Sequence, residues 1–469
     1  MPEFPLYSLS AEMSDCHKYL IVNINDGCEP SNLVWVSALP ASVEELKKGE
    51  LHFEKLINEF VGEYSFLGND DELFYFSSTR DAPKKKVITL NIKTGEEAVL
   101  VEEQSSVLSY AALARQTLLL IYLEDVKDVF YYRRLSETTM RKLDIPIGSV
   151  VSLFSKRNKN FVSFKISSFL LPGRSYTFDV EDPEKTLAIF SDDTVAGLDA
   201  DNFVTEQRFY QSADGTSIPM FIVYKKGCLS PTSPVLLYGY GGFNISLTPS
   251  FSPSRIVFLN NLNGVLAVPN IRGGGEYGQA WHDAGRRENK QNCFTDFIEA
   301  ARFLHKNDIG SPATTAIMGG SNGGLLVAAC ANQAPEEFST VVCQVGVLDM
   351  YKFHKFTIGH AWVSDYGNPD KEEDFLVQQK YSPIHNVKEG VKYPAILVVP
   401  VTTTTVWSLC TRSSTWRRCN TRTPPWVAPF WRVWRWRQVT VRVNPSKIIR
   451  EAADMYTFIA KHINAEWHA

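Results

Sequence analysis

The chain has 469 residues, of which 44% are hydrophobic, and its formal net charge is −4. This length suffices for two sizeable domains, and the slightly acidic balance gives no reason to expect a nucleic acid or an anionic membrane as partner. No apolar run reaches the roughly 18 residues that span a bilayer, and the N-terminal segment lacks a charged stretch followed by an apolar one. We therefore expect a cytoplasmic protein with no membrane partner.

The first 195 residues contain pairs of alternating, strand-like runs that recur every 43 to 54 residues. The first runs of the pairs begin at Tyr19, Leu73, Thr117 and Asn160, and the second runs at Leu33, Lys86, Val129 and Ser175. An all-strand repeat of this length is typical of β-propeller blades, which cannot bury their apolar faces alone. The pattern leaves two stacked β-sandwich domains open as an alternative. We predict a partial β-propeller of about four blades over residues 1–195.

From Val235 onward, short apolar strands alternate with helical stretches. The strands include "PVLLYGY", "GVLAVPNI", "TTAIMGG" and "VVCQVGV", and the helical stretches include "CFTDFIEAARFLHKN" and "NGGLLVAACANQ". Such alternation indicates parallel strands joined by crossover helices. We predict a doubly wound, mostly parallel α/β domain over residues 196–469, with its functional groups at the carboxyl ends of the strands.

The eight cysteines are scattered and form no Cys-x-x-Cys pair. Cys330 and Cys343 lie within apolar runs, which favours buried thiols over disulfides or a metal site. We expect neither a cofactor nor a metal.

One turn in the α/β region carries chemistry. In "TTAIMGGSNGGLLVAAC" a strand, a tight turn and a helix follow one another, and residues 319–323 match Gly-x-Ser-x-Gly with Ser321 at the centre. Glycines around a serine permit a strained elbow that lifts the hydroxyl clear of the sheet, and the N–H of the next residue, Asn322, faces the site of a developing oxyanion. A glycine-rich turn that happens to contain serine is the plain alternative.

Long segments around this turn resemble the catalytic domain of the prolyl oligopeptidase family. They are "LLYGYGGFNISLTPSF", "LAVPNIRGGGEYGQAWHDAGRRENKQNCFTDF", "GGSNGGLLVAACANQ" and "KFHKFTIGHAWVSDYG". The resemblance begins in the strand-rich repeats, runs to Val399 and resumes at "SKIIREAADMYTFIA". It implies an α/β-hydrolase fold preceded by a β-propeller, and a monomeric cytosolic serine peptidase that cuts short peptides after proline.

The resemblance also implies roles for individual residues. Ser321 matches the nucleophile, and the Tyr240 hydroxyl joins the Asn322 N–H in the oxyanion hole. The lining of the pocket for the proline ring is matched by Phe243, Val347, Trp362 and Tyr366. Aromatic faces suit a flat, apolar ring that lacks an N–H, although core packing is an alternative for Phe243 and Trp362. Cys28 matches a thiol near the substrate cavity, but a plain loop cysteine is the simpler interpretation.

A serine nucleophile needs a histidine base and a carboxylate, which follow the serine in α/β-hydrolases. The family carries them in Asp-His-Asp-Asp-Arg-Val-Val-Pro-Leu-His and Ala-Gly-His-Gly-Ala-Gly-Lys-Pro, and neither stretch occurs in this chain. Both should fall within residues 401–444, a segment with a run of four threonines, eight Arg, six of the ten Trp, and no Lys, Asp or Glu. Because this segment contributes +8 to a total of −4, the rest of the chain carries −12.

A shift of reading frame accounts for this segment. Plausible codons for residues 401–411 ("VTTTTVWSLCT"), read one base earlier, encode Gly-Asp-His-Asp-Asp-Arg-Val-Val-Pro-Leu-His. The same shift turns residues 438–445 ("QVTVRVNP") into Ala-Gly-His-Gly-Ala-Gly-Lys-Pro. The shifted frame places the triad aspartate at Thr404, the histidine at Thr440 and a substrate-binding arginine at Val406. A basic, aromatic strip for single-stranded nucleic acid or a membrane surface is the competing interpretation.

Two classes of function remain open. One is a serine oligopeptidase for short proline-containing peptides whose true product carries the triad. The other, if the chain exists as written, is a catalytically dead peptide-binding module. Another peptidase or esterase of the α/β-hydrolase fold is a further alternative, which "YGYGGF" and "GHAWVSDYG" disfavour. The family has seven blades after a first stretch of hydrolase domain, so four repeats with nothing before them indicate a partial sequence.

Overall fold

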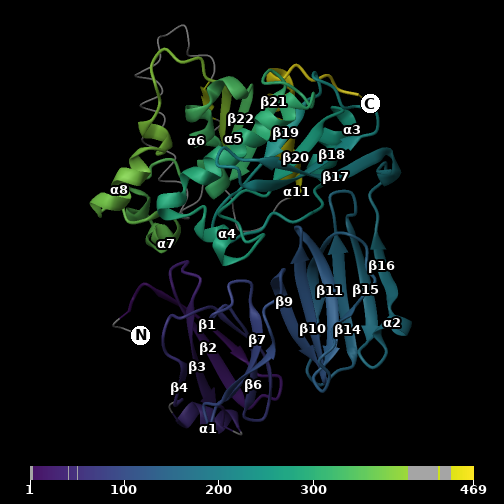
Figure 1. The fold of residues 1–469 in the computed structure, drawn as a ribbon, viewed down its shortest axis with the longest axis vertical. Helices are drawn as coiled ribbons and strands as arrows, with labels where there is room; N and C mark the ends of the chain where they lie inside the picture. The colour runs from purple at the N-terminus through teal and green to yellow at the C-terminus, as the bar shows by residue number, and fades with distance from the viewer. Residues whose placement is uncertain (1–3, 41, 50, 400–430, 434–444, 469) are drawn as a thin grey trace. The chain divides into compact units, whose positions relative to one another are not determined.

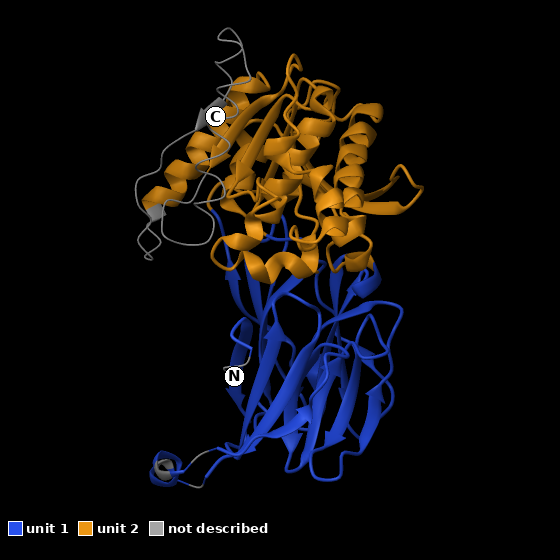
Figure 2. Ribbon diagram, turned by 90° about the vertical axis from the view of Figure 1, so that its left-hand side faces the viewer, with its two compact units in different colours: residues 1–195, 248–250, 277–280 blue, residues 196–247, 251–276, 281–469 orange. Residues whose placement is uncertain are grey.

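The computed structural model describes residues 4–40, 42–49, 51–399, 431–433 and 445–468. The chain forms two compact units, drawn in blue and orange in Figure 2. Unit 1 comprises residues 1–195 with the short segments 248–250 and 277–280, and unit 2 comprises the other residues from 196 onward.

Unit 1 contains four antiparallel sheets of four strands each within the described residues, and in each sheet the strands neighbour one another in chain order. The first two sheets are β1 (Tyr7–Met13), β2 (Tyr19–Asp26), β3 (Asn32–Ala38), β4 (Glu54–Ile57), and β5 (Tyr64–Asp70), β6 (Leu73–Ser78), β7 (Lys86–Asn91), β8 (Glu97–Val101). The other two are β9 (Val107–Ala114), β10 (Thr117–Glu124), β11 (Lys127–Arg134), β12 (Arg141–Lys142), and β13 (Ser149–Phe154), β14 (Phe161–Ser167), β15 (Gly173–Asp179), β16 (Ala188–Asp193). Two short helices, α1 (Val43–Lys48) and α2 (Pro183–Thr186), join strands.

Consecutive sheets of unit 1 pack face to face, which the alternation along single strands makes possible. In β6, Phe74 and Phe76 join a core shared with the first sheet, whereas Tyr75 between them joins the core shared with the third. In β10, Leu118 faces the second sheet and Leu119 the fourth. The second and third sheets are therefore packed on both faces, as blades are, and Figure 1 shows them following one another along the chain.

The eight strand-like runs of the sequence are the second and third strands of these four sheets. The propeller interpretation is favoured over two β-sandwiches, because a sandwich sheet has one packed face whereas the two middle sheets have two. Each sheet also contains a first and a fourth strand that the sequence analysis did not identify. Several of these flanking strands are short or exposed, so their hydrophobic alternation is weak.

Unit 2 is built on one mixed sheet with the strand order β17-β18-β20-β19-β21-β22-β23-β24. Pairs from β20 to β24 are parallel, and those of β17 with β18 and of β18 with β20 are antiparallel. The strands are β17 (Phe203–Gln211), β18 (Ser217–Lys225), β19 (Val235–Tyr238), β20 (Val265–Pro269), β21 (Thr315–Gly320), β22 (Thr340–Gln344), β23 (Ala395–Val399) and β24 (Trp431–Val433). The predicted mostly parallel α/β sheet is thus confirmed.

The helices of this half of the chain include α3 (Pro253–Asn261), α4 (Gln279–Asp283), α5 (Gln291–Lys306), α6 (Asn322–Gln333), α7 (Val363–Tyr366), α8 (Glu372–Gln379) and α11 (Pro445–His462). Single 3₁₀ turns are η1 (Ala200–Asn202), η2 (Arg287–Asn289), η3 (Pro335–Glu337), η4 (Phe353–Lys355), η5 (Gly359–Trp362) and η6 (Pro383–His385). The chain leaves β19 for β20 on one side and then crosses back to β21 on the other. Helix α3 joins β19 to β20, and α5 joins β20 to β21. Because these two crossovers run in opposite directions along the sheet and both are right-handed, α3 and α5 cover opposite faces of the sheet. The strand order therefore changes direction at β19.

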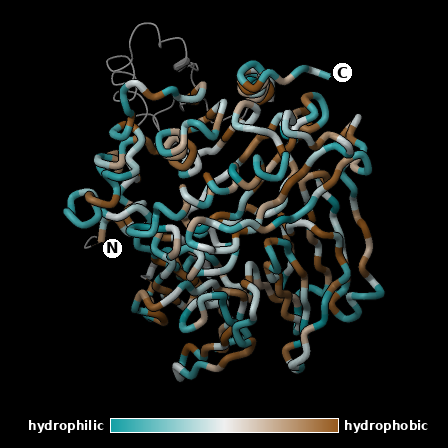
Figure 3. The backbone as a smooth tube through the Cα atoms, turned by 45° about the horizontal axis from the view of Figure 1, so that its top comes forward, coloured by the Kyte–Doolittle hydropathy of each residue, from teal (hydrophilic) through white to brown (hydrophobic). Residues whose placement is uncertain are grey.

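The core of unit 2 lies between this sheet and its helices. Strands β19 to β22 are almost wholly buried, and α5 contributes Phe294, Phe297, Ala301 and Leu304 at helical spacing. In Figure 3 hydrophobic stretches run along strands, and many connections are hydrophilic. Cys330 and Cys343 are buried in this core, as expected.

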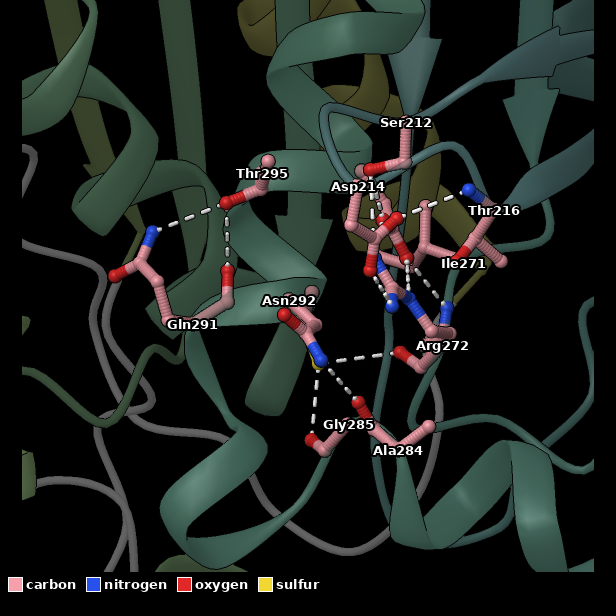
Figure 4. A network of polar contacts seen from close by, with 12 residues as sticks. Ser212, Asp214, Thr216, Ile271, Arg272, Ala284, Gly285, Gln291, Asn292 and Thr295 are labelled. Carbon is pink, nitrogen blue, oxygen red and sulfur yellow. Dashed lines mark hydrogen bonds and ion pairs between the residues drawn. The ribbon is translucent and has the colours of Figure 1, made fainter.

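A buried ion pair ties the loop after β20 to helix α5. The Arg272 guanidinium donates to both carboxylate oxygens of Asp296, at 2.9 and 2.6 Å, and also to Asp214. Figure 4 shows Arg272 between the β17–β18 turn, which carries Asp214, and the segment around residues 284–295. The bond from Arg272 lowers the pKa of Asp214 to about 2. Arg272 and Asp296 are both buried, so removal of the Asp296 charge leaves a buried guanidinium whose other carboxylate partner, Asp214, is half-exposed.

We expect Asp296→Asn to lower the free energy of unfolding by about 3–5 kcal/mol, because the buried Arg272 charge loses its fully buried partner and keeps only the half-exposed Asp214 of the two carboxylates. Asp214→Asn, at a half-exposed carboxylate on the same guanidinium, should cost less than about 1 kcal/mol. Urea denaturation of the two variants beside the parent chain measures both values. Equal, small losses would show that the Asp296 contact does not hold the loop on the helix.

Candidate active site

Ser321 lies at the elbow between β21 and α6, with φ +61° and ψ −119°. A residue other than glycine in this left-handed region is strained. Its N–H donates to the Gln344 carbonyl at 2.9 Å, and its carbonyl accepts the N–H of Gly324 at 2.9 Å. These bonds to β22 and to the first turn of α6 hold the strained serine in place.

The glycines around Ser321 are required by close backbone approaches. A Cβ at Gly319 would lie 2.2 Å from the Gly323 carbonyl oxygen, and one at Gly323 would lie 2.5 Å from the Gly239 carbonyl oxygen. Real side chains do not tolerate such distances to backbone atoms. The Gly-x-Ser-x-Gly pattern therefore brings the elbow into contact with the segment that follows β19.

Tyr240 belongs to that segment, and its hydroxyl lies close enough to the Ser321 side chain for Ser321 to act on the pKa of the phenol. The contact follows from the sheet, because β19 and β21 are parallel neighbours and end at the same edge. Burial raises the pKa of Tyr240, while the nearby Ser321 side chain acts in the opposite direction. The phenol is therefore protonated at neutral pH and can donate a hydrogen bond.

Asn322 joins the elbow to the rest of the site through its side chain. Its Nδ2 donates to the Tyr240 carbonyl at 2.5 Å, and its Oδ1 accepts from the Tyr366 hydroxyl at 3.0 Å. Asn322 is also the first residue of α6, whose first N–H groups have no partner inside the helix. Its backbone N–H and the Tyr240 hydroxyl thus lie on the two elements that meet at Ser321.

The four residues matched to the proline pocket lie together. Phe243 meets Tyr366 edge to face with ring centroids 5.3 Å apart, Phe353 lies 5.2 Å from Tyr366, and Trp362 stacks on Phe353 at 6.4 Å. Val347, Tyr366 and Trp362 are buried in the core of unit 2, and Phe243 packs against it. We refer to these four residues, the aromatic Phe243, Trp362 and Tyr366 together with the aliphatic Val347, as the aromatic group.

An ion pair that the sequence analysis missed lies behind these residues. Asp365 Oδ1 accepts from the Phe243 N–H at 2.9 Å and from His282 Nε2 at 2.8 Å, and Oδ2 is 3.2 Å from Lys290 Nζ. Burial would raise the pKa of Asp365, but Lys290 and the bonds from His282 and Phe243 outweigh it, so this pKa is lowered. Burial would lower the pKa of Lys290, but Asp365 raises it overall. Both groups are therefore charged at neutral pH.

Nothing local in the sequence marks Lys290 and Asp365 as partners, because 75 residues separate them. A lysine in "GRRENKQN" and an aspartate in "WVSDYG" are most simply interpreted as solvated charges. Their one signal is that both stand inside segments that carry the family resemblance. Only the fold shows that both are buried.

Glu276 is a second buried acid near the site. Its Oε1 accepts from the Leu247 N–H at 2.9 Å and from Asn270 Nδ2 at 3.3 Å, so it links the chain beyond residue 243 to the loop after β20. Burial raises its pKa to about 7, and these bonds only partly offset the effect.

The sequence analysis also singled out four further positions, Cys28, Thr404, Val406 and Thr440. Thr404, Thr440 and Val406 lie outside the described residues. Cys28 is an exposed residue of unit 1. In the part of the chain that the structure describes, no group of three or more His, Cys, Asp or Glu side chains could hold a metal ion. None of the described helices is long and apolar enough to cross a membrane.

Comparison with known proteins identifies the family of this chain. Residues 249–402 match the prolyl oligopeptidase family, and residues 1–191 match its N-terminal β-propeller domain. The structure superposes on prolyl oligopeptidase B from Galerina marginata, solved with a 35-residue hydrolysis and macrocyclization substrate, with a TM-score of 0.95 and 34% identity. That match covers 100% of this chain and 67% of the other.

The chain belongs to the prolyl oligopeptidase family. Among curated members, it is 39% identical over 401 residues to prolyl oligopeptidase A of Galerina marginata, and 36% identical over 415 residues to the prolyl endopeptidase of Dictyostelium discoideum. The matches cover 84% and 85% of this chain, and 54% of each relative. The chain thus spans about half the length of these relatives. The family confirms the predicted fold class, an α/β-hydrolase fold preceded by β-propeller blades.

Glu276 predicts a pH dependence of stability. Its folded pKa of about 7 lies above the value of roughly 4.3 in an unfolded chain, so the folded state holds the proton more tightly. The stability that this proton contributes is present below about pH 4.3 and is lost as the pH rises through about 7. Glu276→Gln keeps the acceptor oxygen and cannot ionise. We expect its melting temperature to exceed that of the parent increasingly between pH 5 and pH 8.

Melting temperatures of the parent and of Glu276→Gln, measured at pH 5 and at pH 8, test the predicted pH dependence. Glu373→Gln, at an exposed position of α8, serves as the control and should follow the parent at each pH. A constant difference between Glu276→Gln and the parent would contradict the assigned titration.

Proposed function

We propose that this protein is a serine-type oligopeptidase that hydrolyses short peptides on the carboxyl side of proline. The observation that carries the proposal is the strained Ser321 elbow, which lies beside Tyr240 and is connected through Asn322 to the Tyr240 carbonyl and to Tyr366 of the aromatic group. The named activities of the relatives support the same reaction. The proposed site residues are those of the sequence analysis.

In the proposed reaction, Ser321 Oγ attacks the carbonyl carbon of the prolyl residue. The carbonyl oxygen becomes an oxyanion, and the Tyr240 hydroxyl and the Asn322 N–H stabilise it. A histidine base takes the serine proton and passes it to the leaving amine, so that a prolyl ester of Ser321 remains. Water, activated by the same base, then hydrolyses the ester and releases the peptide acid.

Proline selectivity would come from the aromatic group. The faces of Phe243, Trp362 and Tyr366, with the apolar side chain of Val347, suit a ring without a hydrogen-bond donor. Removal of an interaction with the proline ring should therefore affect the choice of cleavage site more than the chemistry at Ser321.

We also propose that residues 401–444 are translated out of frame, with the acid in the register of Thr404, the base in that of Thr440 and a substrate-binding arginine in that of Val406. The family match over the catalytic region ends at residue 402, where the change of frame was inferred from codons. The absence of Lys, Asp and Glu between residues 401 and 444 agrees with shifted coding sequence. Sequencing of the transcript across codons 395–450 tests this directly.

A catalytically dead peptide-binding module is the second candidate, and it applies if the chain is made as written. The contacts among Ser321, Tyr240, Asn322 and the aromatic group all lie before residue 400. Such a chain could keep its binding groups without a base.

The proposal also covers the domain boundaries, the cellular location, the oligomeric state and the partners of the protein. We propose domains over residues 1–195 and 196–469, a cytoplasmic monomer, and short proline-containing peptides as its only partners. The structural relative with a bound 35-residue substrate supports a peptide ligand.

Three proteins assayed side by side test the enzyme proposal. They are the chain as written, its double variant Thr404→Asp/Thr440→His, and the product of the full transcript with its frame restored. A peptide with a chromogenic group after proline should be cleaved only by the third, and Ser321→Ala should abolish this turnover. The double variant should stay inactive, because a misplacement of about 1 Å already costs about a hundredfold. Its activity, or that of the chain as written, would refute the frame proposal.

Trp362→Ala in the frame-restored protein tests the proline contact. We expect kcat/KM for cleavage after proline to fall relative to kcat/KM for cleavage after alanine. The fall should correspond to about 1–3 kcal/mol of transition-state free energy, because one aromatic contact in a specificity pocket is lost. Phe353→Leu is the matched control, since Phe353 is buried, stacks on Trp362 and is not assigned to the pocket. If both variants lower melting temperature and leave the proline preference unchanged, Trp362 serves only the core.

A further inference from the structure

We propose that Asp365 and Lys290 are positioning residues that hold the segment 240–243, and with it the Tyr240 hydroxyl, against Ser321 and the aromatic group. This inference rests on the proposed function, because it assigns the pair a part in stabilising the oxyanion. We refer to residues 240–243 as the oxyanion segment.

The oxyanion segment is held at three backbone atoms by three side chains. Asn322 Nδ2 donates to the carbonyl of Tyr240, and Lys290 Nζ donates to that of Gly241 at 3.0 Å. Asp365 Oδ1 accepts the N–H of Phe243 at 2.9 Å. Two of the three tethers thus come from one ion pair, and they act on both sides of Gly242.

These tethers hold a backbone that would otherwise relax. Gly241, Phe243 and Asn244 have φ values of +64°, +56° and +57°. The left-handed region suits glycine but strains a bulky residue such as Phe243. A strained backbone persists only where its surroundings fix it, and the charged bond to the Phe243 N–H supplies such a restraint. Loss of this bond should release the segment locally without disturbing the sheet.

The same pair connects the oxyanion segment to the aromatic group. Asp365 lies in α7 directly before Tyr366, and the Lys290 ammonium is 5.3 Å from the centre of the Tyr366 ring. The Phe243 ring meets Tyr366 edge to face, while the Phe243 N–H is bonded to Asp365. A proline ring that settles against Tyr366 and Phe243 therefore contacts the two residues that the ion pair joins.

Stability alone is a weak reason for such a pair. Lys290 and Asp365 are almost wholly buried, at 1% and 2% exposure of their side chains. Desolvation of two charges offsets most of their attraction, so buried pairs contribute little stability relative to apolar residues. Their geometric requirement is strict, however, because both charges need fixed partners. A role in fixing the oxyanion segment accounts for charges at these positions.

Hydrogen exchange on the full chain as written tests the tether without any need for activity. We expect Asp365→Ala, which removes the acceptor of the Phe243 N–H, to raise the exchange rate of backbone amides in peptides covering residues 241–244 about 10-fold or more. The double variant Lys290→Met/Asp365→Ala removes both tethers and leaves neither charge of the pair without its partner, and it should do the same if the single variant is too unstable to fold. Glu337→Gln is the control, because its ion-pair partners are Arg302 and His305 on α5.

Kinetics of the frame-restored protein test the consequence for catalysis. An oxyanion donor acts mainly in the transition state, so the double variant should lose about 100-fold or more in kcat with KM changed less than about 3-fold. Glu337→Gln should keep both constants. The melting temperature of each variant shows whether a loss arises from unfolding.

The outcomes separate this inference from the proposed function. Unchanged exchange at residues 241–244 in both variants would overturn the tether. Faster exchange with a normal kcat would overturn its role in the reaction. If the frame-restored parent cleaves no prolyl peptide, the proposed function fails, and the assignment of the pair to an oxyanion site fails with it, whatever the exchange rates show.

Discussion

The close approach of two backbones organises the candidate site of unit 2. Gly323, in the first turn of α6, has no room for a side chain because the Gly239 carbonyl lies against it. This approach brings the end of β19 to the end of β21, so that Tyr240 reaches Ser321 and Asn322 reaches the Tyr240 carbonyl. A methyl group at position 323 would push the Gly239 carbonyl away and would separate Tyr240 from Ser321.

The parts of the structure that were predictable are those with a local or periodic signal. The second and third strands of each blade alternate strongly, whereas outer strands such as β12 and β16 are short or exposed, and the sequence analysis missed them. The elbow was predictable because steric constraints force glycine at fixed offsets from Ser321. The aromatic group and Tyr240 were assigned by resemblance alone, and the contacts among Tyr240, Tyr366 and Asn322 became visible only in the fold.

Charged partners far apart in the chain could not be predicted in the same way. Lys290 and Asp365, or Arg272 and Asp214, look like surface residues until the fold buries or pairs them. No periodicity encodes such a pair, because its partners belong to different elements and meet only when the sheet assembles. Electrostatic positioning is therefore the part of this site that sequence reasoning reaches last, although it rests on some of its most buried polar groups.

The residues proposed to act in the site come from two separate stretches of the chain. The serine, the oxyanion segment and the aromatic group are assembled by contacts among residues 239–366, and the ion pair that restrains them lies within the same range. In the family order the acid and the base come after the serine, in a part of the chain that none of these contacts involves. Under the proposed function, the groups that bind the peptide and the groups that transfer protons are thus encoded in separate stretches of the chain. A change of frame after residue 400 would remove the second and leave the residues of the first intact, so retention of peptide binding cannot by itself establish that the chain is an enzyme.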